Sequence, residues 1–121
     1  MNRIPSFKDL DVWQKAMNLV DRSYELTKSY PAEERFDLTA ETRKTARSVP
    51  YNIAEGKMRL TSKDFRRHVS IALGSLGELQ TQILIAGRRK YLGLETVAAL
   101  EKEIEEVGRM LRGLERALAI A

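Results

Sequence analysis

The chain has 121 residues, of which 43% are hydrophobic and 31% charged, and this composition predicts one folded domain over residues 1–121 rather than a disordered chain. It contains no cysteine, which excludes disulfide frameworks, thiolate metal sites and cysteine nucleophiles. The net charge is +4, no run approaches the roughly 18 apolar residues of a membrane span, and no apolar signal segment opens the chain, so we expect a cytoplasmic protein without membrane contact.

The first predicted helix extends from about Ser6 to Ser29. Its apolar residues are spaced alternately three and four positions apart, as on one face of a helix: Leu10, Trp13, Met17, Val20 and Tyr24. Ser6 followed by Asp9 resembles a capping box, in which each side chain bonds the other residue's backbone amide. Tyr30 precedes Pro31, and because a residue before proline disfavours helical backbone, we expect the helix to end there.

The second predicted helix, about Glu33 to Met58, contains Pro50. Its weaker apolar stripe continues on both sides of the proline: Leu38, Thr42, Thr45, Val49 and Ile53. Proline inside a helix costs about 3 kcal/mol or more, because it lacks an amide hydrogen and its ring crowds the preceding turn, so we predict one helix kinked at Pro50. Two polar residues beyond the kink, Asn52 and Glu55, lie close to Gly56 and the helix end, and we expect them to hydrogen-bond the local backbone or a partner, or to anchor the turn into the next helix.

The third predicted helix, about Ser62 to Lys90, has a regular apolar stripe: Phe65, Val69, Ala72, Leu76, Leu79, Ile83 and Ala86. Thr61 or Ser62 is expected to cap its start. A second stripe of small residues lies beside the first: Ser70, Gly74, Gly77 and Thr81. A glycine in a helix interior costs about 1 kcal/mol relative to alanine, so two on one face indicate that another backbone approaches closely. That backbone belongs either to a neighbouring helix of the same chain or to another subunit.

The fourth predicted helix, about Glu95 to Ile120, carries the clearest stripe: Val97, Leu100, Ile104, Val107, Leu111, Leu114 and Leu118. Its acidic residues come early and most of its basic residues late, which suits the helix dipole. Four amphipathic helices with short connections predict an all-α fold, an antiparallel up-and-down four-helix bundle.

The sequence contains no catalytic or metal-binding motif. His68 is the single histidine, and the pair Asp64 and His68 lacks the two Glu-x-x-His motifs of a di-iron bundle. Because His68 follows Arg66 and Arg67, we expect it to face solvent or nucleic acid. A nucleophile elbow, a Walker loop and a dinucleotide fingerprint are also missing. We therefore predict a protein that is not an enzyme and uses no metal or cofactor.

Positive charge is concentrated in one part of the sequence. Between Arg43 and Arg67 there are eight basic residues and only two acidic ones, Glu55 and Asp64. The eight are candidates for contacts with nucleic-acid phosphates: Arg43, Lys44, Arg47, Lys57, Arg59, Lys63, Arg66 and Arg67. The alternative is a solvated face with scattered ion pairs. A monomer with a charge of +4 favours that alternative, whereas a ring of identical subunits would gather the charges on one surface.

Four segments, in order along the chain, carry a family pattern: F-K-D-L-D-V-W-Q-K-A (7–16), Y-P-A-E-E-R-F-D-L (30–38), S-V-P-Y-N-I-A-E-G (48–56) and I-A-L-G-S-L-G-E-L-Q-T-Q (71–82). They resemble the four-helix-bundle proteins encoded in intervening sequences of 23S ribosomal RNA genes. The resemblance covers about Phe7 to Tyr91 and implies a bundle that assembles into a homopentameric ring. It also implies a fold similar to that of the accessory proteins of diversity-generating retroelements, basic pentamers that bind RNA and a reverse transcriptase.

We therefore expect a non-enzymatic oligomer that binds RNA or another nucleic acid through a basic surface of its second and third helices. The alternative is a protein–protein interaction scaffold without direct nucleic-acid contact, with a partner such as a reverse transcriptase. The residues expected to shape the kink and the assembly are Pro50, Asn52, Glu55, Gly56, Ser70, Gly74 and Gly77.

Overall fold

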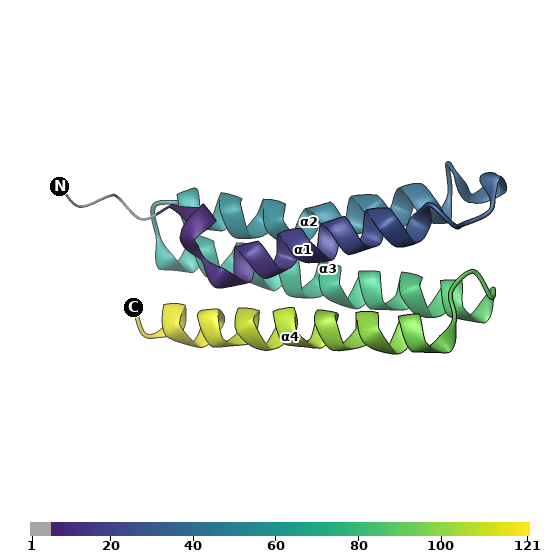
Figure 1. Ribbon diagram of the computed structural model, residues 1–121. Helices are drawn as coiled ribbons and strands as arrows, with labels where there is room; N and C mark the ends of the chain where they lie inside the picture. The colour runs from purple at the N-terminus through teal and green to yellow at the C-terminus, as the bar shows by residue number, and fades with distance from the viewer. Residues whose placement is uncertain (1–5) are drawn as a thin grey trace.

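The computed structural model describes residues 6–121, which form an antiparallel up-and-down bundle of four α-helices (Figure 1). The α-helices are α1 (Asp11–Thr27), α2 (Leu38–Met58), α3 (Ser62–Arg88) and α4 (Leu94–Ala119). Two short 3-10 turns, η1 (Phe7–Asp9) and η2 (Ala32–Glu34), precede α1 and α2. The predicted all-α four-helix bundle is thus confirmed.

The two ends of the bundle differ in what they contain. The first and last described residues lie at the same end as the tight turn between α2 and α3, which we name the turn end (Figure 1). The α1–α2 and α3–α4 connections lie together at the opposite end, which we name the loop end, where the rings of Tyr30 and Tyr91 are 5.4 Å apart. The largest helix interface is between α2 and α3, and the smallest is between α1 and α4.

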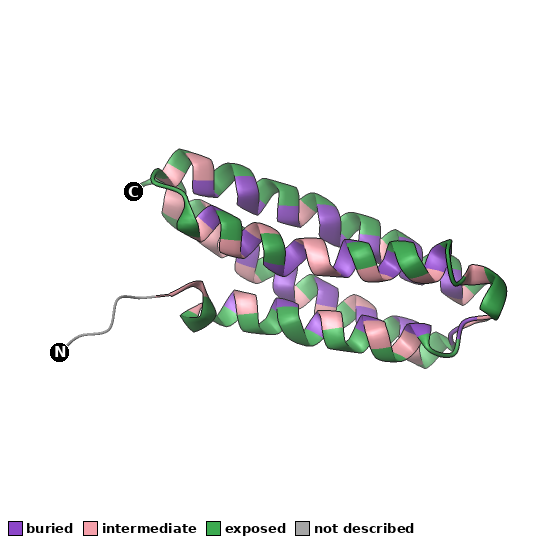
Figure 2. Ribbon diagram, turned by 90° about the horizontal axis from the view of Figure 1, so that it is seen from above, coloured by how far each residue is buried: buried purple, intermediate pink, exposed green. Residues whose placement is uncertain are grey.

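The core lies along the inner faces of the helices (Figure 2). All the residues of the predicted stripes in α2 and α3 are buried, as are those of α4 up to Leu111. Only Leu114 and Leu118, near the end of α4, are partly buried. Each fully buried leucine or isoleucine contributes roughly 1.5–3 kcal/mol, so this core is the main source of stability.

The buried face of α1 differs from the prediction by one position. The residues that face the core are Val12, Ala16, Leu19, Ser23 and Thr27. Of the predicted stripe, Met17 is 37% exposed and Tyr24 lies against α2. The Ser23 and Thr27 hydroxyls each donate a 2.8 Å hydrogen bond to a carbonyl of α1, which satisfies them in the core.

The predicted helix ends are partly corrected. The Ser6–Asp9 capping box forms, but it caps η1 rather than α1. The second helix begins at Leu38 and not near Glu33, because the preceding residues form η2. Thr61 caps α3 by accepting a 3.1 Å hydrogen bond from the Asp64 amide, as one of the two predicted alternatives.

α3 ends in a Schellman motif with an unusual residue. The Tyr91 amide donates a 2.9 Å hydrogen bond to the Ala86 carbonyl, and the Lys90 amide donates one of 3.0 Å to the Gly87 carbonyl. Lys90 therefore occupies the left-handed position, with φ 65°, where glycine is usual. Lys90 is the one described residue other than glycine with positive φ.

α2 continues through Pro50 as one helix, as predicted. Side chains near the proline bond helix carbonyls: Ser48 Oγ donates to the Thr45 carbonyl at 2.6 Å, and the Asn52 amide donates to the Ser48 carbonyl at 2.8 Å. The bend itself stays a prediction.

α3 is the most apolar helix. Among the described residues it alone is long and apolar enough to cross a membrane by length and composition, and 44% of its most apolar 18-residue window is buried inside the bundle. Central helices of globular bundles share this property. The other residues of this window are exposed or only partly buried.

Candidate nucleic-acid interface

The structure separates the basic region of the sequence into two parts. Arg43 and Arg47 are half-buried against α1. Arg43 Nε donates a 2.8 Å hydrogen bond to Thr27 Oγ1, and its guanidinium lies 4.7 Å from the centre of the Tyr24 ring. Arg47 Nη1 donates a 2.7 Å hydrogen bond to Tyr24 Oη. At 1.5 Å per residue, these two arginines lie about 20 Å from the α2–α3 turn, and they hold α1 to α2.

Lys44 lies on yet another surface. It is exposed and borders a shallow hollow between α2 and α3 together with Glu41 and Glu78. Two carboxylates in the same hollow oppose its charge. Lys44 is therefore separated both from the two arginines beside α1 and from the turn end.

The five remaining candidates gather at the turn end, and we name them the turn cluster: Lys57, Arg59, Lys63, Arg66 and Arg67. Arg59 pairs with Glu55 at 2.6 Å, and Arg66 pairs with Glu115 of α4 at 2.7 Å. The pair between Arg67 and Asp64 is long, at 4.0 Å. Within residues 6–121, Lys57 and Lys63 make no hydrogen bond or ion pair. The cluster thus keeps charge available to a partner.

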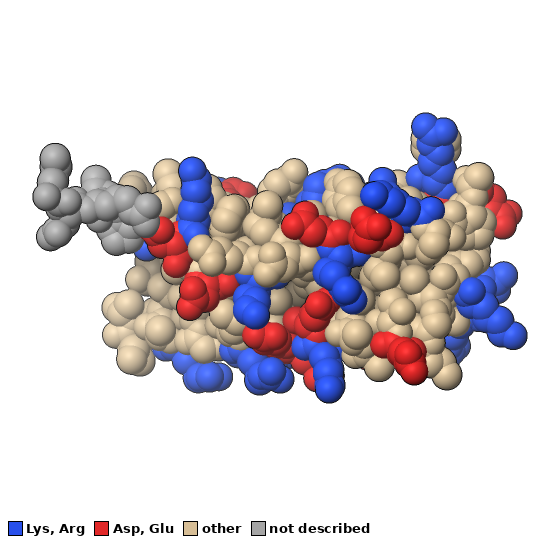
Figure 3. Space-filling model, in the orientation of Figure 1, with Lys and Arg blue, Asp and Glu red and all other residues tan. Residues whose placement is uncertain are grey.

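The face formed by α1 and α4 has a different character. Figure 3 shows acidic and basic side chains interspersed over it. Two ion pairs join these helices there, Lys15 to Glu106 at 3.3 Å and Arg22 to Glu103 at 3.4 Å. Alternating charge of this kind does not favour a polyanion, so the turn end remains the candidate interface.

His68 is buried directly beneath the turn cluster, so the expectation that it faces solvent or nucleic acid is wrong. It is 4% exposed, and its Nδ1 lies 3.1 Å from Asn52 Oδ1. The Asn52 amide nitrogen donates to the Ser48 carbonyl, which leaves the amide oxygen to accept a hydrogen bond from Nδ1–H. Nε2 is then free to accept from Arg67 Nη2, at 3.4 Å.

Glu55 and Gly56 complete the contact between α2 and α3. The hydrogen bond from Arg59 lowers the pKa of the Glu55 carboxyl, which therefore stays charged 3.7 Å from His68 Nε2. A Cβ atom on Gly56 would lie 2.8 Å from Phe65 Cδ1 and 2.9 Å from His68 Cβ, so only glycine fits. This close approach lets α3 begin immediately after α2 and brings the basic residues of both helices together.

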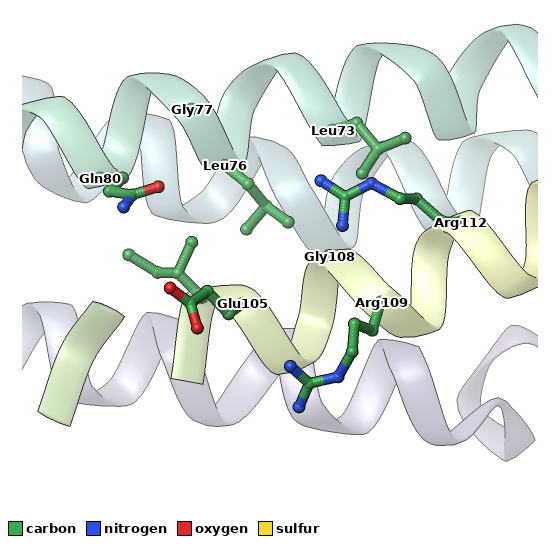
Figure 4. A pocket seen from close by; sticks show the side chains of 9 residues that line it. Leu73, Leu76, Gly77, Gln80, Glu105, Gly108, Arg109 and Arg112 are labelled. Carbon is green, nitrogen blue, oxygen red and sulfur yellow. The ribbon is translucent and has the colours of Figure 1, made fainter. Parts of the chain in front are cut away.

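Two hollows lie between α3 and α4 beside the turn cluster. The first, about 520 Å³, is lined by Lys63, Arg66, Arg67, Ser70, Leu73, Arg112 and Glu115. The second, about 370 Å³, lies further from the turn end and shares Leu73 and Arg112 with the first. Figure 4 shows the Arg112 side chain running from α4 beneath Leu73, with its guanidinium near Gly108, while the Arg109 side chain points away from α3. Sequence reasoning missed Arg112, because only the packing of α4 against α3 brings it to this place.

The small stripe on α3 faces outward. Gly74 and Gly77 are exposed, and a Cβ atom added to either would meet nothing within 4 Å among the described residues. Close packing inside the chain therefore does not explain these glycines. Ser70 is also exposed, and three large apolar residues of α3 are 42–43% exposed: Ile71, Leu84 and Ile85.

The turn cluster is not accompanied by a group of metal-ligating side chains in the described part of the chain. Among residues 6–121, no group of three His, Asp or Glu side chains lies together as metal ligands would. What the described residues offer at the turn end is a set of cationic donors for an anionic ligand.

Comparison with known proteins identifies the family. The family model described as 23S rRNA-intervening sequence protein matches residues 8–113. The chain belongs to this family. A protein with unknown function from the S23 ribosomal protein family of Bacteroides thetaiotaomicron has a similar structure, with a TM-score of 0.80 and 21% identity over 87% of this chain and 95% of that chain. At that identity the likeness shows the fold. No curated protein matches the chain.

The geometry explains one of the segments that carry the family resemblance. In S-V-P-Y-N-I-A-E-G (48–56), Asn52 bonds the buried imidazole, Glu55 pairs with Arg59, and Gly56 admits α3. Asn52 and Glu55 thus lie where α2 turns into α3, in line with one of the roles expected for them, whereas the sequence does not predict the close approach of α3 at Gly56.

Proposed function

We propose that this 23S rRNA-intervening sequence protein is a non-enzymatic homo-oligomer that binds RNA through the turn cluster. The observation that carries the proposal is that neither the half-buried Lys57 nor the exposed Lys63 makes an ion pair within residues 6–121, at the end of the bundle that also holds the three arginines of the turn cluster. Lysine and arginine side chains at helical spacing bind phosphates and release counterions, which makes the affinity strongly dependent on salt.

The test measures binding of a structured RNA at several salt concentrations. We expect the logarithm of the association constant to fall linearly with the logarithm of salt concentration, with a slope of several units. The double variant Lys57→Glu/Lys63→Glu should bind at least about tenfold more weakly, because each reversal removes a cation and adds a repulsive charge. Neither reversal breaks an ion pair of the described residues, so the fold should be retained.

The matched control is Arg88→Glu/Lys102→Glu. It changes the net charge equally, at exposed positions of α3 and α4 that are away from the turn end. If both double variants weaken RNA binding to the same extent, net charge and not the turn cluster governs the affinity. If wild-type protein does not bind RNA, the proposal fails outright.

A second candidate function, a scaffold for protein partners without nucleic-acid contact, is favoured by the outward face of α3. Its glycines and large apolar residues form a surface suited to another helix. We propose that copies of the chain cover it, in the homopentameric ring that the family resemblance implies.

Light scattering of Gly74→Glu, which places a charge on this open face, should show a smaller particle. An unchanged mass for Gly74→Glu contradicts this interface. A protein partner such as a reverse transcriptase that co-purifies with a ring unable to bind RNA would favour the scaffold.

A further inference from the structure

We propose that the hollow of about 520 Å³ between α3 and α4 binds the terminal phosphate of an RNA strand, a proposal that rests on RNA binding at the turn cluster. The other candidate occupants, an internal stretch of the strand or an acidic protein segment, are outcomes of the test below.

The residues of this hollow suit an anion of more than one charge. Four cations line it and one carboxylate, Glu115, opposes them. Arg66 directs both Nε and Nη2 to Glu115 Oε1, at 3.2 Å and 2.7 Å, so that carboxylate is already neutralised. Lys63 and Arg67 remain to face a ligand, Arg112 borders the hollow from α4, and the exposed Ser70 hydroxyl adds a neutral donor.

The excess of cations over carboxylates is larger in this hollow than in the second one. The Arg112 side chain runs from α4 beneath Leu73 of α3, with its guanidinium directed toward Gly108 (Figure 4). There Arg109 and Glu105 line the second hollow, and Gln80 donates a 2.7 Å hydrogen bond to Glu101 beside it. A strand that enters from the turn cluster therefore passes from a hollow with four cations and one carboxylate to one in which the charges are closer to balance. The first hollow is therefore the better place for a group with more than one negative charge.

The charge of the ligand follows from this geometry. A terminal phosphate monoester carries about −1.5 to −2 charges at pH 7, whereas an internal phosphodiester carries one. Guanidinium groups bind such an oxyanion through charge-assisted and often bidentate hydrogen bonds. No aromatic side chain lines the hollow, so it offers no surface for base stacking and the recognition should not depend on base identity.

Gly108 gives Arg112 its position. A Cβ atom at residue 108 would lie 3.3 Å from Arg112 Nη1, so glycine leaves room for the guanidinium to lie against α4. Gly108→Ala should displace the guanidinium with little harm to the fold, because the atom that must move is the end of a flexible side chain.

The experiment compares short oligouridines that differ only at their ends: a 5′-phosphate, a 3′-phosphate, or hydroxyls at both ends. We expect a terminal phosphate to tighten binding about tenfold. The comparison of the 5′-phosphorylated with the 3′-phosphorylated oligouridine identifies which end of the strand the hollow binds. Arg112→Ala should abolish that preference and Gly108→Ala should reduce it. Arg109→Ala, the matched control from the next turn of α4, should retain it. Inorganic phosphate should compete with a phosphorylated oligouridine for binding, and should compete only weakly with the oligouridine that has hydroxyls at both ends.

Each outcome separates this proposal from the RNA-binding function. Equal affinity for all three oligonucleotides, with binding still lost in Lys57→Glu/Lys63→Glu, overturns the end site and leaves RNA binding at the turn cluster. A preference for phosphorylated ends that survives Arg112→Ala places the end site elsewhere and overturns this one. Absence of binding to any oligonucleotide or structured RNA ends both proposals, and binding of an acidic peptide in their place identifies a protein ligand.

Discussion

Lys90 shows how a single residue can hold a conformation that its side chain disfavours. At φ 65° a Cβ atom crowds the backbone, and a residue other than glycine costs about 1 kcal/mol there. The hydrogen bonds from Lys90 and Tyr91 to the last turn of α3 offset this cost.

Lys90→Gly should therefore raise the free energy of unfolding by about 1 kcal/mol, and the melting temperature by about 4 °C. Urea unfolding followed by circular dichroism measures the change. Because Lys90 lies at the loop end, RNA affinity should stay the same in this variant. A loss of stability would mean that the lysine side chain makes a contact worth more than the strain.

Tyr30 is a buried residue whose hydroxyl has no hydrogen-bond partner among the described residues. Burial raises its pKa from 10.0 to about 12. The unfolded chain therefore loses this proton at lower pH than the folded chain does. This titration therefore leaves the free energy of unfolding unchanged below pH 10 and lowers it as the pH rises through about 12.

Tyr30→Phe should weaken the alkaline loss of stability in that pH window. At neutral pH the variant should be as stable as the wild type or more stable, because it removes an unsatisfied buried hydroxyl. Thermal unfolding between pH 8 and pH 12 tests both expectations, with the exposed Tyr51→Phe as the control. If Tyr30→Phe lowers stability at neutral pH, the hydroxyl has a partner such as an ordered water.

At the level of the helix, the sequence predicts which residues share a face but not what that face touches. The stripe of α3 is correct from Phe65 to Ala86 because its apolar residues recur every three or four positions along the whole helix. The stripe of α1 is displaced because hydrophobicity alone ranks Met17 above Ala16, whereas the structure buries the smaller residue.

The same limit explains the basic region. Arg43 and Arg67 belong to the same basic stretch of the sequence. The position of Arg43 around the axis of α2, however, places its side chain against Tyr24 of α1. Five of the eight predicted basic residues gather at the turn end, and Arg112 joins them from a helix that the sequence treats separately. His68 could not be placed by its arginine neighbours, since its partner Asn52 lies on another helix.

Two glycines of adjacent helices should respond in opposite ways to the same substitution. Gly56→Ala should lower the free energy of unfolding by about 1–3 kcal/mol, because the new methyl group would overlap Phe65 and His68. Gly74→Ala should raise it by about 0.5–1 kcal/mol, because alanine favours the helix and the position is open.

Chemical denaturation at a protein concentration below that of assembly measures both glycine variants. A destabilised Gly74→Ala under those conditions would show that another part of the chain packs against α3 there. Size measured at higher concentration then reports separately whether the added methyl group disturbs the oligomer.

At the level of the whole molecule, charge and apolar surface are arranged on different parts of the bundle. Within the described residues, the turn end carries the unpaired lysines, the α1–α4 face carries balanced ion pairs, and the outward side of α3 carries glycines and aliphatic residues. The proposed RNA interface and the proposed contact between copies of the chain therefore use different surfaces.

RNA binding at the turn end should stabilise the folded protein. With RNA at about 100 times its dissociation constant, the free energy of unfolding should rise by about 2.7 kcal/mol and the melting temperature by about 10 °C. Differential scanning fluorimetry at low salt measures the shift, which should vanish at high salt. An equal shift for Lys57→Glu/Lys63→Glu would contradict binding at the turn cluster.

The last described residue lies beside the α2–α3 turn, which has a practical consequence for probing this protein (Figure 1). An affinity tag or a fluorescent fusion joined after Ala121 is tethered next to the cationic end, where we expect it to compete with a polyanion for space. A label attached in the α3–α4 connection, near Gly93, is held at the far pole of the rod. Reporters placed there leave the cationic pole unobstructed.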